Sequence, residues 1–147
     1  MNTRCVLVLT VVLACTAVRA QAQAVGVRAG VSGSPDQFYA GLHYESERLV
    51  DQLRFRPNLE IGVGNDQTVL AFNFEFAYRL PLPRTMWSAY VGGGPALVIH
   101  RVANNTNTGG GFNILIGLEH RRGLFTELKV GAIDSPNIKF AVGYTFR

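Results

Sequence analysis

The stretch that decides the fold runs from Thr68 to Leu80 and reads TVLAFNFEFAYRL. Every second side chain in it is apolar, and most of these are aromatic: Leu70, Phe72, Phe74, Phe76, Tyr78 and Leu80. Asn73, Glu75 and Arg79 lie among the residues between them. Successive side chains of a strand point to opposite faces, so this pattern predicts a β-strand with one apolar and one polar face.

The same alternation recurs along most of the chain. Besides residues 68–80, it covers 25–31, 38–44, 52–63, 87–100, 112–119, 124–131 and 138–147. Turn signals separate these segments, at residues 32–35, 45–51, 64–66, 81–83, 104–111, 121–123 and 134–136. We therefore predict an all-β fold in one domain, residues 25–147: an eight-stranded antiparallel up-and-down barrel that closes on itself.

Two prolines, Pro57 and Pro95, fall inside these strand patterns. A proline has no N–H group for a strand ladder, and a closed barrel has no free edge to place it on. We therefore expect a local β-bulge at each position.

Alternation alone does not say which face points inward. A soluble lipocalin-type barrel has an apolar interior, whereas an outer-membrane barrel has an apolar exterior. Here the apolar face carries almost no charge, although water-facing surfaces normally carry plenty. The opposite face mixes glycines with charges of both signs, which could fill the narrow interior of an eight-stranded barrel.

This pattern favours a transmembrane barrel with a filled interior and no open channel. Charges in a narrow interior are costly unless they are paired, so we predict an ion-pair network there. Its predicted members are Arg28, Arg54, Arg56, Glu60, Glu75, Arg79, Glu119, Glu127, Lys129 and Lys139.

Aromatic side chains at strand ends support the membrane assignment. Tyr78, Trp87, Tyr144 and Phe146 lie on the apolar face, where a lipid-facing aromatic girdle belongs. An even number of strands places both chain ends on one side, the periplasmic side, so residues 101–110 would form the main outer loop.

Residues 1–24 differ in kind from the rest and predict a cleaved secretory signal peptide. Arg4 gives the first positive charge, Cys5 to Cys15 is a nearly unbroken apolar run, and small-x-small sites follow as far as Ala24. The apolar run is shorter than the roughly 20 residues of a spanning helix, which disfavours a retained anchor. Leu13-Ala14-Cys15 also faintly resembles a lipoprotein signal, in which Cys15 would carry the lipid.

Removal of this segment changes the composition of the chain. Both cysteines leave with it, so the mature chain would have no disulfide and no thiol nucleophile. The formal charge falls from +4 to +2, because Arg4 and Arg19 leave as well. The other charges are spread along the chain without a basic patch, which argues against a nucleic-acid partner.

The chain ends in Val142-Gly143-Tyr144-Thr145-Phe146, followed by Arg147. This ending resembles the C-terminal signal that the outer-membrane barrel assembly machinery reads, with Gly143, Tyr144 and Phe146 as its residues; Arg147 departs from the pattern by one position. Together with the signal peptide and eight alternating strands, it makes the whole mature chain resemble the small outer-membrane β-barrels of the protein-A and protein-X type. The resemblance implies a cell outer membrane location, contact with lipid and lipopolysaccharide, and help from the assembly machinery.

Candidate catalytic and metal-binding residues are few. His43, His100 and His120 lack the spacing of metal ligands, so we expect no metal and no cofactor. Outer-membrane lipid A deacylases use Ser, His and an acid on a barrel of this size, but two residues separate His43 from Ser46 where their pattern has one. We therefore expect histidines of the rim or interior and no catalytic site.

A structural or surface-interaction role in the envelope, as a monomer without enzymatic activity, is the function that these observations favour. One alternative is an outer-membrane lipid-modifying enzyme, which predicts a Ser, a His and an acid converging on the outer face near a strand end. The other is a soluble periplasmic binding barrel, which predicts that the face of Leu53, Phe55, Leu59 and Ile61 points inward around a cavity.

Overall fold

The computed structural model of this chain describes residues 23–34, 36–64, 67–102 and 105–147. The described strands are β1 (Ala24–Gly33), β2 (Gln37–Glu45), β3 (Arg48–Val50), β4 (Leu53–Gly64), β5 (Gln67–Pro81), β6 (Trp87–Val102), β7 (Asn105–His120), β8 (Leu124–Ile133) and β9 (Ile138–Phe146). The expected signal peptide, Cys15 included, lies outside the described residues apart from its last two positions, and the last of these, Ala24, begins β1.

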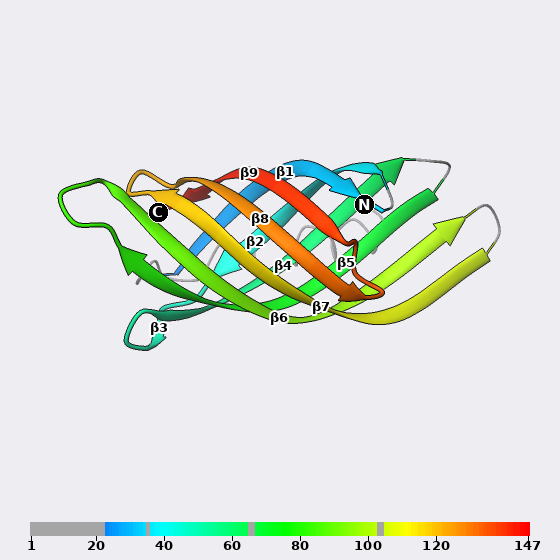
Figure 1. Cartoon of the computed structure of the whole chain (residues 1–147), viewed down its shortest axis with the longest axis horizontal. Coiled ribbons are helices and arrows are strands. Elements are labelled where there is room, and N and C mark those ends of the chain that lie inside the picture. Colours follow the sequence, from blue (N-terminus) through cyan, green and yellow to red (C-terminus); the bar gives the residue numbers. More distant parts are fainter. Residues whose placement is uncertain (1–22, 35, 65–66, 103–104) are drawn as a thin grey trace, which may run out of the picture.

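One sheet holds all of the described strands, in the order β2-β1-β9-β8-β7-β6-β5-β4-β3, and β2 also pairs with β4. The β2–β4 pairing closes the sheet into a ring of eight strands, with the short β3 beside β4 outside the ring. Every pairing around the ring is antiparallel. This confirms the predicted closed eight-stranded antiparallel barrel. Figure 1 shows its tilted strands, with the C-terminus and the β5–β6 turn at one end and the tip of the β6–β7 hairpin at the other.

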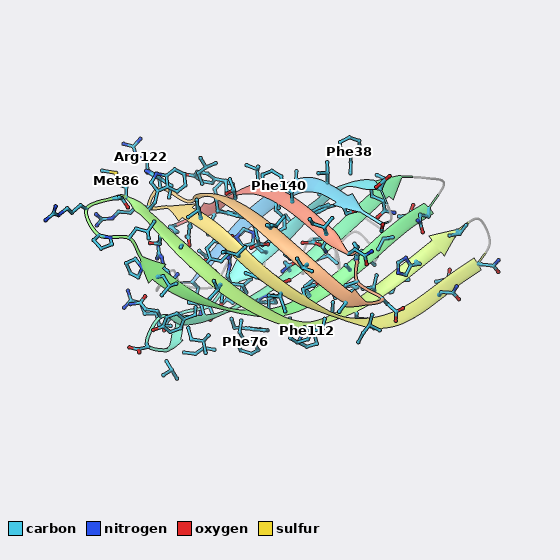
Figure 2. All side chains as sticks on the ribbon, in the orientation of Figure 1. Phe38, Phe76, Met86, Phe112, Arg122 and Phe140 are labelled. Carbon is cyan, nitrogen blue, oxygen red and sulfur yellow. The ribbon has the colours of Figure 1, made fainter. Side chains whose placement is uncertain are left out.

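The two faces of the wall are sorted by polarity as predicted. Charged side chains such as Arg28, Glu60 and Lys129 are buried inside the barrel. Large apolar side chains point outward, as Figure 2 shows for the labelled phenylalanines, and Phe38 is 75% exposed. Ile61 is 51% exposed, so the soluble-barrel prediction that its face lines an inner cavity is wrong.

From Asn105 onward, the loop predicted at residues 104–111 is a strand. β6 and β7 continue their pairing to Val102 opposite Asn105, so residues 105–110 belong to a long hairpin. Asn, Thr and Gly are turn-forming residues, but here the backbone hydrogen bonds of the hairpin outweigh their weak β-propensity. The hairpin reaches further than the β4–β5 and β8–β9 connections beside it (Figure 1).

The bulges expected at Pro57 and Pro95 are also wrong. Pro57 keeps its place opposite Phe74, and the β2–β4 pairing ends one residue away from it. At Pro95 the β5–β6 pairing is interrupted, yet it resumes in the same register on both sides. The ladder therefore loses hydrogen bonds at each proline without taking up an extra residue.

Within the described residues, no helix has the length and hydropathy needed to cross a membrane.

Candidate functional site

The charged interior of the barrel is the candidate functional site. Lys129 of β8 lies at its centre and is fully buried. The Lys129 Nζ atom is 2.8 Å from Glu75, 3.1 Å from Glu60 and 3.5 Å from Glu127. Since Glu60 and Glu75 belong to β4 and β5, one ammonium group ties β8 to strands on the opposite side of the barrel.

Two further cations complete this central cluster. Arg28 of β1 donates a hydrogen bond of 2.9 Å to Glu127 and pairs with Glu60 at 3.3 Å. Lys139 of β9 donates to Glu60 at 2.6 Å. Counted over the described residues, three cations face three carboxylates in this cluster, so its charges balance.

A ladder of amides lies against the central cluster. The Asn113 Nδ2 donates to Asn73 Oδ1, and the Asn73 Nδ2 donates to Asn58 Oδ1, each at 2.7 Å. Asn58 in turn donates to Glu75, also at 2.7 Å. These bonds give each of the three buried amides at least one partner, although the Asn113 Oδ1 atom accepts none within the described residues. They also give the buried Glu75 carboxylate additional donors, which such a polar interior needs.

A second cluster lies nearer the end of the barrel that carries the C-terminus. Glu45, the last residue of β2, accepts a hydrogen bond from Arg54. Glu45 also pairs with Arg56 at 3.6 Å and with Arg147 at 3.2 Å. We call the following residues the terminal cluster: Glu45, Arg54, Arg56, Arg79, Glu119 and Arg147.

Arg147 bridges the two carboxylates of the terminal cluster, because it also pairs with Glu119. Glu119 pairs in addition with Arg79, at 3.9 Å. Arg56 reaches Glu127 at 3.6 Å and so joins the terminal cluster to the central one. Over the described residues, four guanidinium groups of the terminal cluster share two carboxylates.

Inward-pointing rings are accommodated by glycines on neighbouring strands. Within the described barrel, a Cβ atom added to the glycine would meet the ring opposite it in four cross-strand pairs: Tyr39 with Gly30, His43 with Gly26, Tyr90 with Gly117, and Phe125 with Gly143. A Cβ atom added to Gly117 would lie 2.2 Å from the Tyr90 ring. The glycines of the polar face therefore provide the space that large interior side chains occupy.

These rings also contact the charges. The Arg56 guanidinium lies 4.6 Å from the centroid of the Tyr90 ring and 5.4 Å from that of Phe125. The Tyr90 hydroxyl donates to Glu127 at 2.9 Å. Stacked and hydrogen-bonded in this way, the interior is filled and held in one arrangement.

The ten residues predicted for the ion-pair network all point into the described barrel, and each makes at least one ion pair. Sequence reasoning missed Glu45, which it assigned to a turn, and it left Arg147 out of the network although alternation placed this residue on the polar face of the last strand. It also overlooked Asn58, Asn73 and Asn113. Alternation had already placed the three amides on the polar face, so only their hydrogen bonding was new.

The four predicted girdle residues point outward at the end of the barrel that carries the C-terminus. The Tyr144 and Phe146 rings are 5.2 Å apart in an edge-to-face contact, and Trp87 packs against His120 at 4.9 Å. Tyr78, the fourth, is exposed near the end of β5. Of the residues predicted for an assembly signal, Tyr144 and Phe146 lie outside, whereas Gly143 lies inside beneath the Phe125 ring.

The residues considered for a hydrolase site lie apart. His43 points into the barrel, with its Nε2 atom 3.0 Å from the Thr145 Oγ1 atom. Ser46 lies beyond the end of β2, where its Oγ atom accepts a 3.0 Å hydrogen bond from the Phe55 N–H. Among the described residues, no group of three or more His, Cys, Asp and Glu side chains is placed to hold a metal ion.

The class that this geometry defines is a closed eight-stranded β-barrel with a filled polar interior and an apolar exterior. No family model matches the chain, and no curated protein matches its sequence.

Solved structures with the same fold come from bacterial surface and outer-membrane proteins. Neisserial surface protein A has a TM-score of 0.61 at 14% identity, covering 84% of this chain and 92% of that one. The N-terminal β-barrel domain of Pseudomonas aeruginosa OprF has a TM-score of 0.57 at 14% identity, covering 87% of this chain and 100% of the domain. The outer membrane enzyme PagL has a TM-score of 0.55 at 13% identity, covering 84% and 98%. At these identities the similarity shows the fold alone.

Proposed function

We propose that this protein is an outer-membrane β-barrel of a Gram-negative bacterium. Its barrel is closed to ions, and its role lies in envelope structure or surface interaction and is not enzymatic. The observation that carries the proposal is the exterior, where large apolar side chains such as Phe112 and Phe140 surround the barrel (Figure 2). Soluble monomers rarely expose contiguous apolar patches larger than a few hundred Å². A closed barrel pairs its backbone groups between strands, so such a wall is stable in hydrocarbon.

Outer-membrane lipid and lipopolysaccharide are the expected partners of this exterior. A hollow of about 540 Å³ lies at the outer surface where the β2–β4 pairing ends, and apolar side chains such as Val25, Leu42 and Phe74 line it. Hydrocarbon chains would fill this hollow favourably, whereas contact between water and its apolar side chains would cost free energy. The location is further supported by the shared fold of a neisserial surface protein and an outer membrane enzyme.

The filled interior supports a closed barrel and not a pore. Lys129, Glu60 and Glu75 pair across the middle of the barrel, and the Asn113 amide lies fully buried beside them. An ion would have to break these pairs to pass. We therefore expect purified monomeric protein to give no stable conductance in planar bilayers.

Cell fractionation combined with heat-modifiability tests the location. We expect the mature protein in the outer-membrane fraction, with an unboiled sample that migrates differently from a boiled one on a denaturing gel. Protein found soluble in the periplasm, with no heat-dependent shift, would overturn the proposal.

A deletion strain tests the role. Loss of a structural barrel should increase leakage of a periplasmic reporter and sensitivity to detergents, and the native chain should restore both. Mass spectrometry of lipid A from the same strains tests the enzymatic alternative. A change of acylation that depends on this protein would replace the structural role with a lipid-modifying one.

A further inference from the structure

The two mouths of the barrel differ in size. At the end opposite the C-terminus, the hollow among Tyr39, Glu60 and Lys139 measures only about 20 Å³. At the end that carries the C-terminus, a mouth cavity of about 390 Å³ is open. This volume lies within the range of about 300–1,000 Å³ that is usual for small-molecule sites.

Arginines from four parts of the chain line the mouth cavity. They are Arg48 of β3, Arg79 of β5, Arg121 of the β7–β8 turn and Arg147 behind β9. No aspartate or glutamate is among its described lining residues. The cavity therefore presents guanidinium groups from several directions to whatever enters it.

The positive charge at this mouth is not balanced. The central cluster is neutral, but in the described part of the chain the terminal cluster beneath the cavity has four guanidinium groups for two side-chain carboxylates, and only one of the four, Arg56, also pairs with a carboxylate of the central cluster. Within the described residues, Arg48 and Arg121 at the rim have no ion-pair partner at all. Glu47 and Asp51 are exposed in the β2–β4 connection and do not line the cavity. The interior thus carries its uncompensated charge beside the mouth cavity.

One of the lining arginines is only loosely held in the terminal cluster. The Nε atom of Arg79 lies 3.9 Å from Glu119 and has no hydrogen-bond partner within the described residues. Gln52, Thr85 and Ser88 line the cavity as well and provide neutral polar groups beside the arginines.

We propose that this mouth is a binding site for an anion of the phosphate class that carries at least two negative charges. Guanidinium groups match phosphate oxygens in charge and in their planar arrangement of donors. We expect a ligand with at least two negative charges because the excess positive charge of the arginines at the mouth is larger than one. The phosphate could belong to a soluble compound of the periplasm or to the headgroup of an anionic phospholipid in the adjacent leaflet. The site goes beyond the proposed envelope role, and its test does not depend on that role.

Pyrophosphate is the soluble probe, titrated calorimetrically at low salt into the full chain folded in a nonionic detergent. Heat-modifiability of each sample shows first that the barrel is folded. The second arm compares stability in phosphatidylcholine vesicles with and without phosphatidic acid. Binding in the first arm alone assigns a soluble ligand, and a stability gain in the second arm alone assigns a lipid headgroup.

The variants Arg48→Gln and Arg121→Gln remove rim charges that support no ion pair in the described barrel, so both should fold. Each should weaken pyrophosphate binding by about tenfold or more, the range of a lost charged hydrogen bond. Arg122→Gln is the matched control, because Arg122 follows Arg121 in the same turn, is exposed and does not line the cavity. The proposal is overturned if the native chain responds in neither arm, or if Arg122→Gln weakens binding as much as Arg121→Gln.

Discussion

Lys129 is the residue whose loss should disturb the interior most, because three carboxylates share its ammonium group away from water. Lys129→Met keeps the length of the side chain but leaves those carboxylates without their common partner. Breaking a buried ion pair in this way costs about 3–5 kcal/mol. We expect a loss of this size in the free energy of unfolding, measured by urea titration of the protein in vesicles.

Arg101→Met is the control for this variant, since Arg101 is exposed and makes no ion pair within the described residues. It should change stability by less than about 0.5 kcal/mol. Equal effects of the two substitutions would show that Lys129 is not held in a dry, balanced cluster.

Gly117 shows how a single missing side chain makes room for the interior. A Cβ atom there would lie 2.2 Å from the Tyr90 ring and 2.6 Å from the Thr126 carbonyl oxygen. We expect Gly117→Ala to lower the free energy of unfolding by about 1–3 kcal/mol through overpacking. Gly110 lies in the same strand with nothing within 4 Å of an added Cβ, so Gly110→Ala should be close to neutral. A neutral Gly117→Ala would mean that the Tyr90 ring does not occupy this place.

At the scale of elements, β9 pairs with β1 and β8 in the ring and also ends in the predicted assembly signal. Phe146 lies opposite Val25 of β1, with its side chain exposed on the outer face. Because few contacts inside the barrel depend on this ring, Phe146→Ala should refold in detergent nearly as well as the native chain. In cells it should lower the amount of barrel in the outer membrane several-fold, as measured by fractionation and immunoblot.

Phe38→Ala is the matched control, because Phe38 is an exposed phenylalanine at the opposite end of the barrel. It should leave the cellular amount unchanged. A Phe146→Ala protein that assembles at the native level would remove Phe146 from the assembly signal.

The strands could be predicted because each is polar on one face and apolar on the other over most of its length. Residues 105–110 lack that contrast, since their side chains are small or polar on both faces. Their strand conformation comes from pairing with β6, which only the folded hairpin reveals. The β-bulge at Pro57 was mispredicted for a related reason. Whether a strand responds to a missing N–H group with a bulge or only with a lost hydrogen bond depends on how the neighbouring strands pair with it.

The sequence could predict which charged residues point into the barrel, but not which of them pair with one another. Alternation identified which charges point inward, because a period of two assigns faces directly. It cannot say that Lys129 of β8 meets Glu75 of β5, since that pairing depends on barrel closure and diameter. Glu45 was missed because it lies at the end of β2, in a segment that was assigned to a turn. Arg147 was on the polar face of the alternation, but its position behind Phe146 gave no sign that it reaches Glu45 and Glu119.

At the scale of the whole molecule, the barrel reverses the usual distribution of polarity. Its charges hold the interior together, while its apolar side chains face outward. In the membrane location that we propose, the hydrophobic effect acts between the barrel and the lipid and contributes little to packing inside the wall. The cost in folding free energy of a charged substitution on the exterior should consequently depend on the depth of that position in the membrane.

Ile116→Arg tests this dependence in the middle of the wall. Ile116 is 54% exposed on β7, opposite Val91 and Leu128, so an arginine there would face the hydrocarbon. In vesicles it should cost about 2–4 kcal/mol of folding free energy, the cost of a basic side chain at the bilayer midplane. Val102→Arg, at the tip of the β6–β7 hairpin, should cost no more than about 1 kcal/mol. Equal costs at the two sites would mean that the exterior does not face a bilayer, because water would solvate an arginine equally well at both.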